Sequence, residues 1–169
     1  MKKIKSFKSL IWDTNISNHK IFKSIIHFFA YGFGSGLIPV APGTMGTVMA
    51  IPFYLLLNQL SLPLYALMIG ITFCFGVYCC GLTANDLGEH DHPSIVWDEM
   101  VGYWITMFAI PLTWYWIVTG FLLFRFFDIW KPWPVRAIDK RVHGGLGIML
   151  DDVIAGIFAW VVIRVILIF

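Results

Sequence analysis

The sequence contains few charged side chains, and long stretches contain none. Only 13% of its 169 residues are Asp, Glu, Lys or Arg, whereas about a quarter of the residues in soluble domains are charged. Residues 24–85, 100–124 and 153–163 contain no charged side chain. Apolar runs of about 18 or more residues are typical of membrane-spanning helices. The composition therefore predicts an integral membrane protein rather than a soluble one.

Other classes of protein are disfavoured by what the sequence lacks. A net charge of +2 is too small to indicate nucleic-acid binding. The three cysteines, Cys74, Cys79 and Cys80, lie inside an apolar segment without the spacing of a metal site, so we interpret them as small core residues. The basic N-terminus is not followed by an uninterrupted apolar run and a small-residue cleavage site, so we do not predict a cleavable signal peptide.

The chain divides into a basic N-terminal arm, residues 1–20, and a membrane-embedded helical domain, residues 21–169. The arm would be attracted to anionic lipid headgroups, since it is rich in lysine. An amphipathic or re-entrant helix is expected from residue 20 to about residue 31. Five further helices are expected at about 46–58, 63–84, 98–111, 114–130 and 150–168. The predicted fold class is all-α, a polytopic bundle of membrane helices.

The connections between the predicted helices differ sharply in charge. Residues 58–63 and 111–114 are short and uncharged, whereas residues 85–99 and 128–152 hold most of the ionisable groups. Cytoplasmic loops collect Lys and Arg, so we place the N-terminus and both charged connections in the cytoplasm. Residues 31–46 then lie on the same side. The polar loops and helix ends are therefore expected to gather at one cytoplasmic face.

The segment YGFGSGLIPVAPGTMGT, residues 31–47, is expected to form part of a site. It contains five glycines and two prolines, which are incompatible with a regular helix over its whole length. Non-helical backbone at membrane depth persists where it is buried in protein or lines a polar cavity. We assign Thr44, which lies in this segment, to the predicted phosphate-binding group.

Carboxylates and basic residues cluster at three predicted helix ends. Asp98 and Glu99 begin one helix, and two more acids, Asp151 and Asp152, are expected to open the last helix. Each pair could be a metal-ligand pair or a charge pair that the helix dipole stabilises. A fifth carboxylate, in RFFDIWKPWP (residues 125–134), lies one helical turn after an arginine. A structural ion pair is the alternative interpretation there.

Together these groups predict metal-assisted phosphoryl chemistry. Five carboxylates at one face would repel each other unless a cation lies between them, and all-oxygen ligands favour hard cations such as Mg²⁺. Basic side chains and glycine amides supply anion-binding groups. The predicted metal ligands are Asp98, Glu99, Asp128, Asp151 and Asp152. The predicted phosphate or headgroup ligands are Arg125, Lys131, Arg136, Gly144, Gly145 and Thr44. His143 and Asp152 are the predicted catalytic residues.

Four stretches of the sequence resemble the phosphatidylglycerophosphatase A family. They are GFGSGLIPVAPGTMGT, HDHPSIVWDEMVG, RFFDIWKPWPVRAID and VHGGLGIMLDDVIAG, in the order of the family and over about residues 29–160. The resemblance implies a Mg²⁺-dependent phosphatase of the bacterial inner membrane, which converts phosphatidylglycerophosphate to phosphatidylglycerol and phosphate in phospholipid biosynthesis. Ile38 and Thr47 stand where the family often has Ser, so we assign neither a catalytic role.

The sequence favours one mechanism and one function class over their alternatives. We prefer attack by water that Mg²⁺ activates, with His143 positioning or protonating the leaving group. A phosphohistidine route through His143 is the second choice, and an aspartyl-phosphate route lacks the expected doubled aspartate. CDP-alcohol phosphotransferases and the acid phosphatase superfamily require motifs that are absent from this sequence. A transporter would favour charges at mid-membrane, whereas here they gather at one face.

Overall fold

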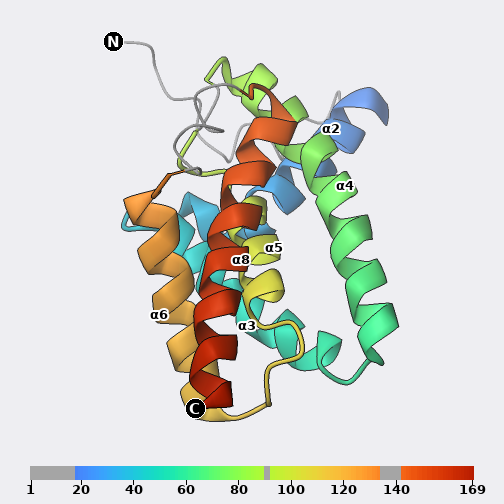
Figure 1. Cartoon of the computed structure of the whole chain (residues 1–169). Helices are drawn as coiled ribbons and strands as arrows, with labels where there is room; N and C mark the ends of the chain where they lie inside the picture. Colours follow the sequence, from blue (N-terminus) through green and yellow to red (C-terminus); the bar gives the residue numbers. More distant parts are fainter. Residues whose placement is uncertain (1–17, 90–91, 134–141) are drawn as a thin grey trace.

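The computed structural model describes residues 18–89, 92–133 and 142–169, and these residues form helices and loops without strands. Figure 1 shows how the helices are arranged. The elements are α2 (Asn18–Ala30), the 3₁₀ helix η1 (Gly32–Leu37), α3 (Pro42–Leu57), α4 (Leu62–Leu87), α5 (Trp97–Thr106), α6 (Trp114–Trp130) and α8 (Gly145–Ile168).

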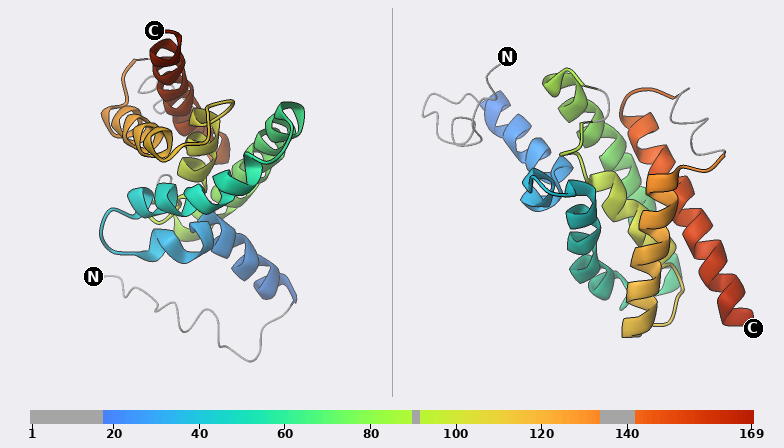
Figure 2. Two further views of the ribbon diagram at one scale, coloured as in Figure 1. Left: turned by 90° about the horizontal axis from the view of Figure 1, so that it is seen from below. Right: turned by 90° about the vertical axis from the view of Figure 1, so that its left-hand side faces the viewer.

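Helix α5 is the short central element of the bundle, and it contacts α3, α4, α6 and α8 (Figures 1 and 2). Met100, Val101 and Tyr103 on this helix are fully buried. The backbones of α5 and α8 approach closely, because a Cβ atom on Gly156 would lie 2.5 Å from the carbonyl oxygen of Gly102. The central helix is therefore held on several sides.

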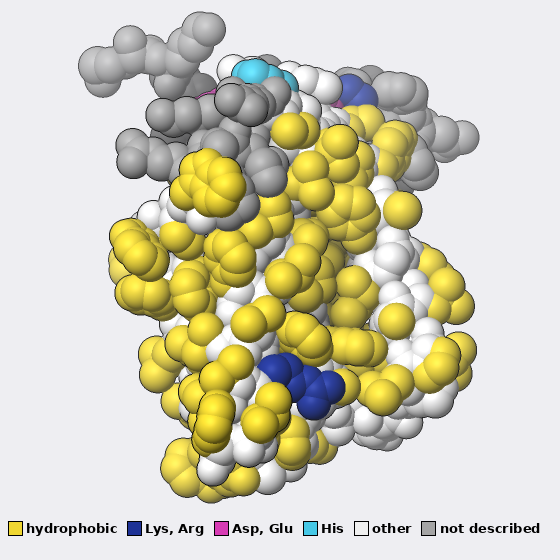
Figure 3. All heavy atoms as spheres, viewed as in Figure 1, with side chains coloured by type: hydrophobic (Ala, Val, Ile, Leu, Met, Phe, Trp, Pro, Cys, Tyr) yellow, Lys and Arg dark blue, Asp and Glu magenta, His cyan; other side chains and the backbone are white. Residues whose placement is uncertain are grey.

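Two helices, α4 and α8, are long and apolar enough to cross a membrane by length and composition. They contain 26 and 24 residues, which corresponds to about 36–39 Å at a rise of 1.5 Å per residue. Hydrophobic side chains also cover most of the face in Figure 3. Exposed apolar surface of this extent indicates contact with a membrane or another apolar partner.

The charged connections meet at one end of the bundle. The ends of α4 and α6 and the starts of α5 and α8 lie in the upper half of the bundle in Figure 1, whereas the uncharged turns around residues 58–61 and 107–113 lie at the lower end. The arrangement follows from the alternation of short uncharged and long charged connections. The grouping of polar helix ends that the sequence predicts is thus present in the fold.

Three predicted helix boundaries were wrong. Helix α3 begins at Pro42 rather than near residue 46, because proline fits the first position of a helix. Helix α5 ends at Thr106 rather than near residue 111, and Ala109 then adopts a positive φ of 55°. Helix α8 begins at Gly145, about five residues before the predicted start. The acidic pair of α8 therefore lies inside the helix rather than at its opening.

The glycine-rich segment before α3 is irregular, as its composition predicts. Within η1, Phe33 and Gly34 have positive φ values of 59° and 92°. The ring of Phe33 nevertheless stacks on Phe53 of α3, with 4.8 Å between ring centroids. The amide of Val96 donates a hydrogen bond of 2.9 Å to the carbonyl of Ala30. These contacts fix the segment beside the start of α5.

Helix α2 is attached to the end of α4 by polar contacts. Lys23 forms an ion pair with Asp86, at 2.9 Å, and His27 contacts both Asp86 and Thr83, at 3.3 and 3.0 Å. Burial lowers the pKa of His27, although the charge of Asp86 opposes this shift. Lys23 and His27 thus both face the carboxylate of Asp86. The helix is thereby positioned along the bundle.

The contact between Gly102 and Gly156 predicts a specific loss of stability. The substitution Gly156→Ala places a methyl group against the backbone of α5, and such overpacking costs about 1–3 kcal/mol. We expect the midpoint of thermal unfolding in detergent to fall by about 2–10 °C. Gly70→Ala on α4 is the matched control, because nothing lies within 4 Å of the added atom. Equal midpoints for the two variants would contradict this packing role.

Candidate active site

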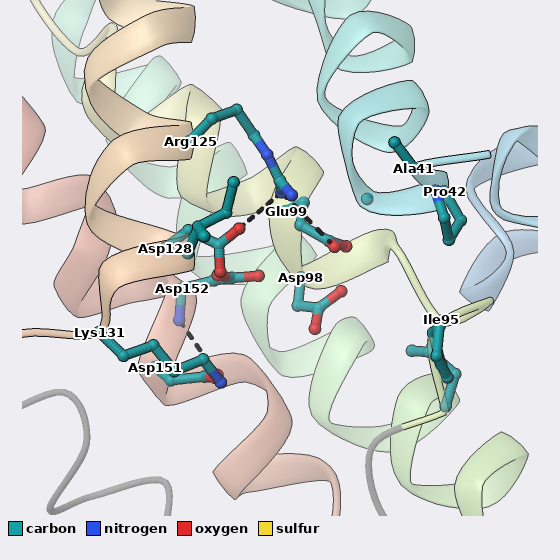
Figure 4. A pocket seen from close by; sticks show the side chains of 13 residues that line it. Ala41, Pro42, Ile95, Asp98, Glu99, Arg125, Asp128, Lys131, Asp151 and Asp152 are labelled. Carbon is teal, nitrogen blue, oxygen red and sulfur yellow. Dashed lines mark hydrogen bonds and ion pairs between the residues drawn. The ribbon is translucent and has the colours of Figure 1, made fainter.

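One cavity of about 340 Å³ contains all five predicted carboxylates. It lies where α3, α5, α6 and α8 meet (Figure 4). The described residues that line it are Ala41, Pro42, Gly43, Pro93, Ile95, Asp98, Glu99, Arg125, Asp128, Ile129, Lys131, Asp151 and Asp152. Sequence segments that are more than 100 residues apart therefore contribute to one polar pocket.

Asp98 and Glu99 lie in the first turn of α5, as the sequence predicts. The preceding residue, Trp97, fixes this turn, because its ring N–H donates a 3.1 Å hydrogen bond to the carbonyl of Thr72 on α4. Asp98 is buried, and the side chain of Glu99 is 13% exposed. The helix start thus holds two carboxylates in a largely enclosed position.

Asp151 and Asp152 approach from α8, and both are buried. They lie in the second turn of the helix, since α8 begins at Gly145. The helix dipole acts mainly within the first turn, so the predicted stabilisation at a helix start does not apply to this pair. Positive charges other than the helix dipole must therefore compensate the negative charges of Asp151 and Asp152.

Three carboxylates are close enough to share one cation. One oxygen from each of Asp98, Glu99 and Asp152 lies within 4.8 Å of the other two. Oε2 of Glu99 and Oδ1 of Asp152 are buried and have no hydrogen-bond partner in the described part of the chain. Buried charge of one sign without partners is costly. Oxygen ligands in this arrangement fit a hard divalent cation such as Mg²⁺.

Arg125 partly balances the acidic cluster from α6. Its Nη1 atom lies 2.6 Å from Oδ2 of Asp128 and 3.7 Å from Oε1 of Glu99. The guanidinium group points toward both carboxylates in Figure 4. The ion pair with Asp128, considered as an alternative from the sequence, is therefore present inside the pocket. Binding of a substrate headgroup by Arg125 stays a prediction.

Lys131 contributes a second positive charge at the edge of the pocket. The residue follows the end of α6 and adopts a left-handed conformation with φ of 44°. Its ammonium group forms an ion pair with Asp151, at 2.5 Å. The turn at the end of α6 therefore brings a basic side chain to the start of α8, where it reduces the negative charge of the acidic pair.

Gly43 is a pocket residue that the sequence analysis did not identify. A Cβ atom at this position would meet the carboxylate of Glu99 and lie 3.1 Å from Nη1 of Arg125. The glycine therefore leaves room for the side chains of the site. Gly43 follows Pro42 in the first turn of α3 and has no positive φ, so its close contacts rather than its backbone conformation account for glycine here.

Thr44, His143, Gly144 and Gly145 are not among the described residues that line this cavity. Thr44 lies next to Gly43 in the first turn of α3, and His143 is exposed before the start of α8. Gly144 has φ of 76° at the start of α8. Arg136 lies outside the described residues. Their roles stay predictions.

Gly145 has a packing role that its sequence context did not reveal. It is buried where α8 crosses α4, and an added Cβ atom would collide with the carbonyl group of Val77 and lie 2.8 Å from the amide nitrogen of Gly81. The close approach of two helix backbones accounts for glycine at this position. Phosphate binding by its amide group stays a prediction.

Comparisons with known proteins identify the family. The family model for phosphatidylglycerophosphatase A matches residues 28–167. The chain is 54% identical over 134 residues to phosphatidylglycerophosphatase A of Escherichia coli, covering 79% of this chain and 78% of the relative. It is 49% identical over 140 residues to phosphatidylglycerophosphatase A of Haemophilus influenzae, covering 82% and 86%. No solved structure gives a significant match. The chain belongs to the phosphatidylglycerophosphatase A family.

Proposed function

We propose that this protein hydrolyses phosphatidylglycerophosphate to phosphatidylglycerol and phosphate, with Mg²⁺ as its cofactor. The observation that carries the proposal is the cluster of Asp98, Glu99 and Asp152, whose oxygens lie within 4.8 Å of each other beside two basic side chains. The names of the two relatives support the substrate. A phosphate monoester on a membrane lipid would provide the anion that this mixed cluster accommodates.

The carboxylates would hold the metal ion. Asp98, Glu99 and Asp152 form the central ligand group, and Asp128 and Asp151 line the same cavity. When bound, Mg²⁺ would activate the attacking water and neutralise charge on the phosphate. Partly buried charges act more strongly than exposed ones, because less water screens them. The pocket is therefore suited to stabilise a transferring phosphoryl group.

The side chains of the pocket would divide the remaining tasks. Arg125 and Lys131 would orient the phosphate oxygens by charge-assisted hydrogen bonds. Asp152 would accept a proton from the water whose oxygen forms the new bond to phosphorus. The bond between phosphorus and the glycerol oxygen breaks, and that oxygen takes up a proton as phosphatidylglycerol leaves. The exposed His143 is the proposed source of this proton.

We place the protein in the bacterial inner membrane as a multi-pass protein, with the carboxylate pocket facing the cytoplasm. The length of α4 and α8 supports membrane insertion, and the basic residues of the connections support the orientation. A transporter is the alternative from another class. The described acidic residues lie near one end of the bundle. This favours an enzyme that acts at one membrane face over a transporter.

Metal removal tests the proposed cofactor. EDTA should abolish phosphate release from phosphatidylglycerophosphate, and added Mg²⁺ should restore it. Asp98→Asn and Asp152→Asn should each lower turnover at least about 100-fold, because each removes a charged group from the metal site. Asp86→Asn, in the cluster between α2 and α4, is the matched control and should retain turnover. Full activity in metal-free buffer would refute the cofactor.

His143 tests the chemical route. A group that only donates a proton contributes about 10²–10⁴-fold to the rate, and His143 is exposed and absent from the cavity lining. We therefore expect His143→Gln to reduce turnover by about 10²–10⁴-fold without abolishing it, and we expect no covalent phosphoenzyme. Rapid quenching under alkaline conditions with labelled substrate measures this directly. Trapped phosphohistidine at position 143 would instead support the nucleophilic route.

Topology can be measured by cysteine labelling in intact cells. In a variant without Cys74, Cys79 and Cys80, an impermeant thiol reagent should label Leu60→Cys and leave Glu89→Cys unlabelled. The reason is that residue 60 lies in an uncharged turn at the end of the bundle opposite the carboxylate pocket. Permeabilised cells provide the control, since both positions should then react. Labelling of position 89 alone in intact cells would reverse the orientation.

A further inference from the structure

A second cavity adjoins the carboxylate pocket on the outer side of α6. It has a volume of about 480 Å³ and is lined by Arg125, Phe126, Ile129 and Trp130. Arg125 and Ile129 also line the carboxylate pocket. The two cavities are therefore neighbours that share one charged and one apolar side chain. We call the second cavity the α6 groove.

The α6 groove continues into an apolar track along the helix. Val118, Leu122, Phe126 and Trp130 are spaced four residues apart, so each neighbours the next and together they form a ridge that winds partly around α6. Their exposed fractions are 48%, 60%, 53% and 64%. The twelve residue steps of this track correspond to a rise of about 18 Å, slightly more than half of a bilayer core of about 30 Å. The track thus extends along α6, away from the carboxylate pocket, over a length comparable to the thickness of one leaflet.

The lining changes from charged to apolar side chains between the carboxylate pocket and the α6 groove. Arg125 lines both cavities, and its guanidinium group points toward Glu99 and Asp128 in the carboxylate pocket, as Figure 4 shows. In contrast, Phe126 and Trp130 pack their rings together, with centroids 5.4 Å apart. Tryptophan is enriched at the boundary between the membrane and water. The end of α6 therefore has the polarity profile of a phospholipid, with charge at one end and hydrocarbon along the other.

We propose that the α6 groove binds an acyl chain of the phospholipid substrate while its phosphate occupies the carboxylate pocket. This inference rests on the proposed function and adds a location and a side of approach, from the leaflet along α6. The acyl chain is already surrounded by lipid hydrocarbon before it binds. The hydrophobic effect therefore contributes little to its affinity for the groove. Its contribution is van der Waals contact and orientation of the lipid relative to the site.

Photocrosslinking tests where the chain lies. The full protein is reconstituted in phosphatidylcholine vesicles with a phosphonate analogue of phosphatidylglycerophosphate that carries a diazirine on one acyl chain. We expect crosslinks to concentrate on residues 122–130 and to decrease when unlabelled phosphatidylglycerophosphate is added. A phosphatidylcholine probe with the same chain is the control, and its crosslinks should be insensitive to the competitor. Competitor-sensitive crosslinks that concentrate on other helices would overturn the proposal.

Kinetic variants provide a second measurement. Trp130→Ala should raise KM for phosphatidylglycerophosphate in mixed micelles by about threefold to tenfold and change kcat less, because the groove positions the chain without touching the phosphate. Trp114→Ala is the matched control on the same helix, since this tryptophan is 76% exposed at the far end of α6. Equal KM values for the two variants would overturn the subsite. Absence of phosphate release by the unmodified protein would instead refute the proposed function, independently of the crosslinks.

Discussion

The mutual repulsion of buried carboxylates is the constraint on which the rest of the structure depends. Oxygens of Asp98, Glu99 and Asp152 are held within 4.8 Å of one another, although two of these acids are almost fully buried. An arrangement of this kind persists only if rigid elements and opposite charges hold it. The close contact of α5 with α8 supplies the rigid element, and Arg125 and Lys131 supply the charges.

The position of the acids within their helices decides how they are balanced. Asp98 and Glu99 lie in the first turn of α5, where the helix dipole favours negative charge. Asp152 lies in the second turn of α8 and gains little from that effect. It also lacks a hydrogen-bond partner for Oδ1 within the described residues. A divalent cation between Asp98, Glu99 and Asp152 would compensate this negative charge. The geometry and the proposed Mg²⁺ chemistry therefore support each other.

Sequence reasoning was most successful where one local signal dominated. Helix α6 spans 114–130, as predicted, because uncharged apolar residues follow one turn and Pro132 soon ends the run. The five acids meet because their helix ends share one side of the bundle. The start of α8 was misplaced because glycines favour loops, yet Gly145 instead permits close packing against Val77. The role of Gly43 depends on long-range contacts with Glu99 and Arg125, which local sequence does not encode.

The same helix, α6, connects the polar and apolar halves of the molecule. Residues 125, 128 and 131 direct charge into the pocket, whereas residues 122, 126 and 130 leave large apolar side chains exposed. Both sets follow from helical periodicity, since positions three or four residues apart share a face. A phosphate monoester without an acyl chain would contact only the charged residues 125, 128 and 131. A lipid without a phosphate would contact only the apolar residues 122, 126 and 130. The arrangement of α6 therefore favours a substrate that carries both groups, and this requirement is one that a lipid phosphate meets.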